Sequence, residues 1–171
     1  MTQQLNLPLA TSQPSRWGTG SSAIFKNMEN RTTPARITQL APNEVFVFGS
    51  NLAGIHGAGA AKAALRFWAK TGLGTGLVGQ TYAIPTKSRE MNVLPPQVIA
   101  FHVWLFLAEA GLSLLAGSDT VYLVTPIGCG LAGYAPEQIA PMFAMAAQLK
   151  NVHLPAEFWE VLNNAASGEK A

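Results

Sequence analysis

The feature that most limits the possible folds of this chain is an apolar run followed at once by a glycine-rich loop. The sequence after the loop is typical of the start of a helix. Residues 125–134 read TPIGCGLAGY, and Pro136 opens the segment that follows. Glycine lacks a Cβ, so its backbone can approach a ligand closely, and proline suits the first turn of a helix. The pattern predicts a strand, a loop whose N–H groups can hold an anion, and a helix.

A second turn of the same kind lies upstream, where residues 45–49 read VFVFG and residues 50–59 read SNLAGIHGAG. Its glycines follow the order G-x-x-G-x-G, the reverse of the dinucleotide fingerprint, and no acidic residue stands at the usual spacing. A standard dinucleotide-binding site is therefore not expected. A strand followed by free N–H groups and a helix start still favours an anion, although a plain strand-to-helix turn explains the same glycines.

The rest of the chain alternates between strand and helix patterns. Strands are predicted over 36–40, 44–48, 81–84 and 120–125, and helices over 58–70, after Pro95, over 136–150 and over 155–164, with a glycine-rich connection at 71–80. This alternation favours a layered α/β domain. If the strands before the two turns run parallel, both turns lie at one edge of the sheet, where such folds bind ligands.

Length and composition predict one domain, because 171 residues that are 49% hydrophobic and 12% charged can bury one sizeable core. Residues 1–34, rich in polar residues, glycine and proline, are expected to form a flexible or draped leader. The single domain is expected over 35–165, with a tail at 166–171. Residues 91–108 carry no Asp, Glu, Lys or Arg, but two prolines and a histidine interrupt them, which favours a buried core helix over a membrane span.

Charge and cysteine content narrow the classes of partner. The chain carries 11 basic and 9 acidic residues with no basic run, so polymeric nucleic acid is not expected as its main partner. The lone Cys129 cannot form an internal disulfide and no signal-peptide pattern opens the chain, which favours the cytoplasm. Three scattered histidines and one cysteine give no metal-binding pattern, and no cofactor is expected. A homo-oligomer is compatible with the sequence.

Several reactive or aromatic side chains have both a functional and a structural interpretation. Lys87 ends the segment IPTK at 84–87, where it is either an ordinary surface lysine or, once desolvated, a nucleophile. Cys129 has no adjacent base and is expected to pack the loop. His102 is expected to be a core histidine. The aromatic residues expected to pack the core or the helices are Phe67, Trp68, Trp104 and Phe106.

Three segments, taken in order, resemble the macro domain family, in the branch that includes the DarG antitoxin and terminal ADP-ribose glycohydrolases. Residues 48–61, FGSNLAGIHGAGAA, resemble its strand, asparagine-containing loop and helix start. Residues 84–87 resemble its lysine segment, and residues 126–134, PIGCGLAGY, resemble its phosphate-binding loop. The resemblance covers 36–150, and the last third of the chain also resembles small phage and bacterial proteins of unassigned function.

The resemblance implies a three-layer α/β/α sandwich around a mixed sheet, with ADP-ribose lying across the strand ends. Asn51 would face the distal ribose, the backbone of 57–60 would line that ribose and the nearby phosphate, and the loop 128–134 would cradle the diphosphate. Tyr134 would cover the ligand. The apolar walls of an adenine pocket would come from Val47, Leu52 and Phe143.

The candidate site combines the two loops with the end of the strand between them. The predicted ligand-binding residues are Gly49, Ser50, Asn51, Leu52, His56, Gly57, Ala58, Gly59, Ala60, Thr86, Ile127, Gly128, Cys129, Gly130, Leu131, Ala132, Gly133 and Tyr134. Lys87 is the candidate catalytic residue. His56 is expected either to donate to a phosphate or ribose, or to turn to solvent at the loop tip.

Three functions remain open. The preferred one is a binding module that captures ADP-ribose or an ADP-ribose-derived signalling nucleotide, which in a phage protein would sequester a defence signal in the host cytoplasm. The alternative is a glycohydrolase that removes ADP-ribose from a macromolecule, in which Lys87 attacks the ribose anomeric carbon. Hydrolytic members of the family also use an aspartate in the last loop, where this chain has Ala132 or Gly133. The third is an oligomeric structural protein whose glycines only form tight turns.

Overall fold

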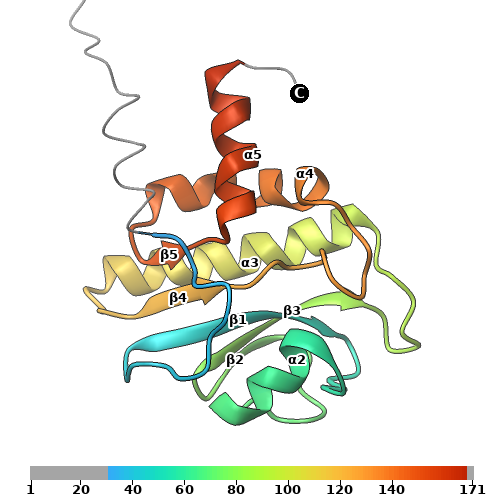
Figure 1. The fold of residues 1–171 in the computed structure, drawn as a ribbon. Helices are drawn as coiled ribbons and strands as arrows, with labels where there is room; N and C mark the ends of the chain where they lie inside the picture. Colours follow the sequence, from blue (N-terminus) through green and yellow to red (C-terminus); the bar gives the residue numbers. More distant parts are fainter. Residues whose placement is uncertain (1–30, 169–171) are drawn as a thin grey trace, which may run out of the picture.

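Five strands form one mixed sheet in the order β2-β3-β1-β4-β5 in the computed structural model, which describes residues 31–168 (Figure 1). The strands are β1 (Glu44–Asn51), β2 (Gly76–Val78), β3 (Thr81–Lys87), β4 (Val121–Val124) and β5 (Val152–His153). Strand β1 pairs in parallel with both β3 and β4, and β5 is parallel to β4, whereas β2 is antiparallel to β3. The predicted α/β class is confirmed.

Helical segments cover both faces of this sheet (Figure 1). They are α2 (Gly59–Ala64) with the 3₁₀ turn η1 (Leu65–Phe67), α3 (Pro96–Leu115), α4 (Pro136–Ile139) with the 3₁₀ segment η2 (Ala140–Gln148), and α5 (Ala156–Ser167). Two prolines precede the body of α3 and Gly117, with φ +73°, follows its end, as the sequence predicts.

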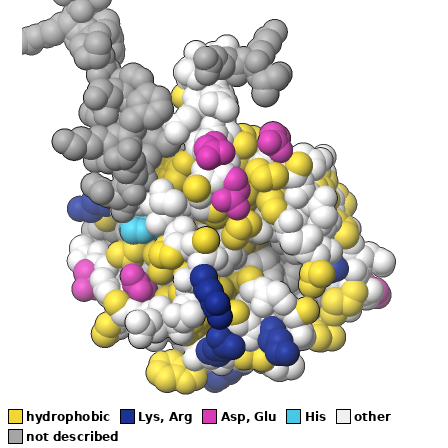
Figure 2. Space-filling view, viewed as in Figure 1, with side chains coloured by type: hydrophobic (Ala, Val, Ile, Leu, Met, Phe, Trp, Pro, Cys, Tyr) yellow, Lys and Arg dark blue, Asp and Glu magenta, His cyan; other side chains and the backbone are white. Residues whose placement is uncertain are grey.

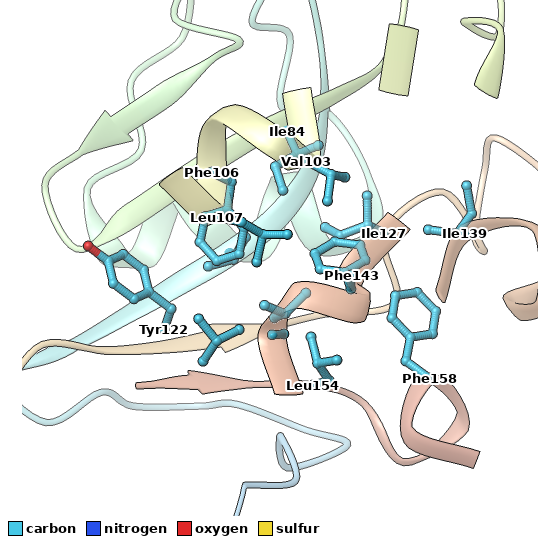
Figure 3. Close-up of a cluster of buried hydrophobic side chains, with 14 of the residues drawn as sticks. Ile84, Val103, Phe106, Leu107, Tyr122, Ile127, Ile139, Phe143, Leu154 and Phe158 are labelled. Atoms are coloured by element: carbon cyan, nitrogen blue, oxygen red, sulfur yellow. The ribbon is translucent and has the colours of Figure 1, made fainter. Parts of the chain in front are cut away.

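Alternate side chains of β1 point to two separate apolar clusters, as the period of a strand requires. Val45 and Val47 join the larger cluster with α3, η2 and α5, and Figure 3 shows Phe106, Phe143 and Phe158 converging there from the three helical segments. The smaller cluster holds Phe46 and Phe48 with α2 and η1 on the opposite face. Burying both faces fixes the register of β1 and therefore the point at which it ends.

Several predicted elements differ in the structure. Residues 36–40 form no strand: both edges of β1 are already paired, and Ile37 and Leu40 pack against the smaller cluster instead. The helix predicted over 58–70 ends early because Trp68 adopts a left-handed backbone, with φ +68°. The helix predicted over 136–150 becomes mostly 3₁₀ after one α turn, since Pro141 cannot donate to the α-helical ladder.

The two outer strands, β2 and β5, lie inside segments where no strand is predicted. They have three and two residues, too few for a sequence pattern to reveal. Of the predicted leader, residues 1–30 lie outside the described residues, as do 169–171 of the predicted tail. Thr33 donates to the Leu154 carbonyl at 2.8 Å, and the Arg31 guanidinium to the Ala146 carbonyl at 2.9 Å, so this segment packs on the domain.

Helix α3 is a core helix on one face only, which corrects the prediction of a buried helix. Its buried side chains are Ile99, Val103, Phe106, Leu107 and Ala110. His102 is half-buried rather than in the core, Trp104 is 55% exposed, and Trp68 on the other side of the sheet is 69% exposed. By length and composition alone α3 is the one described helix that could cross a membrane, a test that core helices of soluble proteins also pass.

Candidate ligand-binding site

The candidate site lies at the carboxyl ends of the three parallel strands β1, β3 and β4. Strand β1 sits between the other two, and the chain leaves it toward α2 on one face of the sheet. From β4 the chain leaves toward α4 on the opposite face. Connections that diverge in this way open a crevice between neighbouring strands, which is where open α/β sheets bind ligands. The parallel pairing that the prediction required is therefore present.

A cleft of about 870 Å³ occupies this edge of the sheet, within the size range of small-molecule sites. Every predicted site residue lines it except Leu52, His56, Ile127 and Gly133. The cleft brings both glycine loops and Lys87 into one space. The structure thus gathers predicted residues that are up to 85 positions apart in the sequence, from Gly49 to Tyr134.

The loop after β4 lines the cleft and leaves several of its backbone donors unpaired. It is closed internally by bonds from the Gly133 N–H to the Gly130 carbonyl at 2.9 Å and from the Tyr134 N–H to the Gly128 carbonyl at 3.1 Å. The N–H groups of Gly128, Gly130, Leu131 and Ala132 make no hydrogen bond to another described residue. Unpaired N–H groups that line a concave surface are suited to an anion.

Gly128 is a position that favours glycine. Its φ is +76°, in the left-handed region, and a Cβ added there would lie 3.2 Å from the Ile139 side chain. Tyr134 forms the next wall of the cleft. Its hydroxyl donates to the Leu94 carbonyl at 2.6 Å, which fixes the ring in place. The loop is therefore held rigidly from both ends.

The first loop is closed by its own asparagine. The Asn51 side chain donates to the Ile55 carbonyl at 2.7 Å and accepts from the Ile55 N–H at 2.9 Å. Asn51 lines the cleft, but this pair of bonds already uses its amide to shape the loop. The N–H groups of Gly57, Ala58 and Gly59, beyond it, make no hydrogen bond to another described residue and add donors on the other side of the cleft.

His56 is buried rather than at an exposed loop tip, and it does not line the cleft. Its ring packs edge-on against Phe48, with centroids 5.2 Å apart, and its Nε2 lies 3.3 Å from Ser50 Oγ. Burial lowers the pKa of His56 below its ordinary 6.5, so the ring is neutral at pH 7. Neither of the two expectations for His56, a phosphate donor or a solvent-exposed side chain, fits this placement.

The other residues predicted near the ligand but absent from the cleft belong to the apolar core or to the back of the loop. Ile127 is fully buried, Leu52 packs against the larger cluster, and Gly133 turns the chain behind the cleft with φ +78°. The proposed adenine walls Val47 and Phe143 are also fully buried in that cluster. Their apolar character serves the core, so the prediction of an adenine pocket there is wrong.

Lys87 ends β3, is half-buried and lines the cleft. Its side chain makes no hydrogen bond or ion pair with another residue of the described chain, whereas its backbone carbonyl accepts from Leu52 N–H at 3.0 Å. The neighbouring Thr86 hydroxyl donates to the Ser50 carbonyl at 3.2 Å and ties β3 to β1. The amine of Lys87 is therefore available to a ligand.

Seven residues that line the cleft are absent from the predicted site, and three of them add new side-chain chemistry. The seven are Ile55, Ala61, Met91, Thr125, Pro126, Pro136 and Glu157. Ile55 and Met91 are exposed apolar side chains at the rim, and both could cover a planar or sugar group. Glu157, at the start of α5, brings the only carboxylate to the lining of the cleft. Acidic side chains gather near α4 and α5, and basic ones over α2 (Figure 2). No local sequence signal links residue 157 to the glycine loops, because only the packing of α5 places it there.

Cys129 faces an environment that keeps its thiol protonated. Burial, together with the carboxylates of Glu157 and Glu137, raises the pKa of the thiol from 9.0 to about 11. The thiol is half-buried and packs against the larger cluster, with Sγ 3.5 Å from the Ile127 carbonyl. Because the thiolate is the nucleophile, Cys129 is unsuited to covalent catalysis at neutral pH.

This environment predicts slow alkylation of Cys129. At about pH 8 we expect iodoacetamide to modify the folded protein on the order of 100-fold more slowly than the urea-unfolded chain, whose thiol ionises near its reference value. The rate for the folded protein should keep rising as the pH approaches 11, while that for the unfolded chain levels off above about pH 9. Equal rates at pH 8 for both states would show that the thiolate forms freely in the fold.

A second cavity of about 730 Å³ adjoins the cleft and shares part of its wall. The residues lining both are Gly59, Ala60, Thr125, Pro126 and Glu157. Its other walls include Arg36 and Arg66, which make no ion pair with another described residue, and the buried Thr33, whose hydroxyl oxygen has no hydrogen-bond partner. The cleft thus adjoins a more cationic cavity.

Comparison with known proteins identifies no relative: no family model, curated protein or solved structure matches this chain. In the described part of the chain, no three His, Cys, Asp or Glu side chains gather in a way that could hold a metal ion.

Proposed function

We propose that the protein binds ADP-ribose, or a nucleotide derived from it, in the cleft at the ends of β1, β3 and β4. The proposal rests on the unpaired N–H groups of two loops that line the same cleft. They belong to Gly128, Gly130, Leu131 and Ala132 in one loop and to residues 57–59 in the other. Two rows of donors suit two linked phosphates. The proposal includes a macro-domain-like three-layer sandwich, which the helices on both faces of the sheet support.

The shape of the site supports one orientation of the ligand. The distal ribose would lie near Asn51 and Lys87, at the end of the cleft formed by β1 and β3. The diphosphate would lie between the two loops, and the adenosine would extend along the wall shared with the second cavity. Sequestration of a signalling nucleotide is the role that such a binding module would fill in a cell.

Glycohydrolase activity is a second candidate, and one observation favours it. Although the loop after β4 lacks an acidic residue, Glu157 brings a carboxylate to the same cleft as Lys87. The Lys87 amine would bond to the anomeric carbon, the bond from that carbon to the macromolecule would break, and the leaving group would take up a proton. The Glu157 carboxylate would accept the proton that the amine loses and pass it to that leaving group. Water would then attack the same carbon and break its bond to the Lys87 nitrogen, which would take up the proton that the water loses, so that ADP-ribose and the free amine result.

Mass spectrometry of the nucleotide that co-purifies with the protein tests binding without a prior choice of ligand. The protein would be denatured and the supernatant analysed for small molecules. We expect an ADP-ribose-type nucleotide in amounts comparable to the protein. The Gly130→Glu variant, purified in parallel, should carry none. A wild-type preparation that holds a nucleotide without a diphosphate would contradict the proposal.

Incubation with an ADP-ribosylated protein separates binding from hydrolysis. If the protein only binds, the modification persists while calorimetry still shows ADP-ribose binding. If it hydrolyses, we expect Lys87→Ala to abolish release of ADP-ribose, since no other lysine lines the cleft. Lys62→Ala, at an exposed lysine away from the cleft, is the matched control and should keep full activity. Release that persists in Lys87→Ala would remove Lys87 from the mechanism.

A further inference from the structure

The outward face of α3 carries an apolar seam with the spacing of a helix–helix interface. Its members are Val98, Phe101, Leu105, Ala108, Leu112 and Leu115, and all of them are exposed. Their spacing alternates between three and four residues along the whole helix, which is the repeat that brings apolar side chains to one seam between packed helices. They lie opposite the residues through which α3 packs on the sheet. The seam is therefore a second packing surface that has no partner among residues 31–168.

The seam is too apolar and too large to be ordinary surface. Phe101 and Trp104 are each 55% exposed, with rings stacked 6.3 Å apart, and Leu115 is 85% exposed. Glu109 is the only acidic or basic residue, histidine aside, in the twenty residues of α3. With roughly 200 Å² for each large side chain, the seam and Trp104 expose roughly 650 Å². A typical protein interface buries about 800 Å² of each partner, so this face supplies most of one.

The residues of the seam are placed symmetrically about its centre, so the seam can pair with an antiparallel copy of itself. When two copies pair antiparallel, with a two-fold axis midway between Leu105 and Ala108, Phe101 of one copy meets Leu112 of the other. Leu105 then meets the small Ala108, and Val98 meets Leu115. Each contact occurs twice, joins apolar to apolar, and puts large against small at the centre, where the helices approach most closely.

We propose that the protein forms a homodimer in which the two α3 helices pack antiparallel through this seam. The seam contributes no residue to the nucleotide cleft, so each subunit keeps a complete site that opens elsewhere. Dimerisation therefore goes beyond the proposed ligand and does not depend on it. The apolar length of α3, which resembles a membrane span in composition, is accounted for by its two packing faces.

Sedimentation velocity of the full chain across a dilution series tests the dimer. We expect the wild-type protein to sediment as a dimer, and Phe101→Lys or Leu112→Glu to weaken association by at least about 100-fold, since each puts two charges into an apolar seam. Both positions are exposed, so neither change disturbs the core. Met145→Glu, at a 56% exposed side chain on η2, is the matched control and should leave the dimer intact.

The double variant Phe101→Lys/Leu112→Glu tests the direction of packing. In the antiparallel pair the two new charges oppose each other across the interface, so we expect the dimer to return. In a parallel pair like charges would meet, and the double variant would remain monomeric. A double variant that remains monomeric would overturn the proposal, and so would a wild-type protein that is itself a monomer. A dimer that survives Phe101→Lys would overturn it as well. So would wild-type protein that does not self-associate but sediments with phosphatidylcholine vesicles.

Discussion

Replacing Gly130 by glutamate is expected to abolish ADP-ribose binding and to leave the fold intact. Gly130 is exposed in the loop after β4 and lines the cleft, and no atom lies within 4 Å of a Cβ added there. Its backbone is outside the left-handed region, so a side chain causes no strain. The new carboxylate would stand where the proposed diphosphate meets the loop. Like charges at that distance should lower the affinity by at least about 100-fold.

Gly130→Gln is the matched control, because it adds a side chain of the same size without the charge. Calorimetry should show ADP-ribose binding to the glutamine variant, weakened far less than in the glutamate variant. Both variants should have the circular dichroism spectrum and melting temperature of the wild type. If the glutamate variant binds ADP-ribose as the wild type does, the loop does not contact the phosphates. If both variants lose binding equally, size rather than charge decides.

Replacing Gly74 by alanine is expected to destabilise the fold by more than about 3 kcal/mol. Gly74 lies against the start of the first loop, and an added Cβ would overlap the carbonyl oxygen of Asn51. An overlap with backbone cannot be relieved by rotating a side chain. Gly54 has the same role from the other side, because its Cβ would overlap the backbone of Gly72 and Leu73. Part of the glycine pattern therefore serves close packing of two backbone segments.

Urea unfolding measures this prediction through the free energy of unfolding. Gly57→Ala is the control, because nothing lies within 4 Å of a Cβ at Gly57 and its backbone is outside the left-handed region. We expect that variant to stay within about 0.5 kcal/mol of the wild type. A Gly74→Ala protein as stable as Gly57→Ala would mean that the 72–74 segment does not press on the loop as the structure shows.

The elements that position the site follow from local sequence signals. The apolar runs within 44–48 and 120–125, each followed by glycines, predict β1, β4 and their loops, and the prolines before Gln97 predict the start of α3. These signals predict the strands correctly because both faces of β1 are buried, so that its apolar residues must match the fold. The prediction that the two loops lie at one edge of the sheet assumed that β1 and β4 run parallel, and the structure has this parallel pairing.

Other features depend on packing that no short window of sequence contains. The strand predicted over 36–40 fails because β1 has no free edge to pair with, a property of the whole sheet. His56 is predicted either to donate to the ligand or to turn to solvent, yet its ring is buried against Phe48. Glu157 lines the cleft and Arg36 lines the adjoining cavity, although the two residues are 121 positions apart in the sequence, and only the tertiary fold brings them near the glycine loops.

Isothermal titration calorimetry of the wild-type protein with ADP-ribose tests the central claim most directly. Adenosine monophosphate, which lacks the diphosphate and the distal ribose, is the matched control ligand. We expect ADP-ribose to bind one site per chain at micromolar strength or better, and the monophosphate to bind much more weakly. Absence of binding by ADP-ribose and by every other adenine nucleotide diphosphate tested would contradict the account.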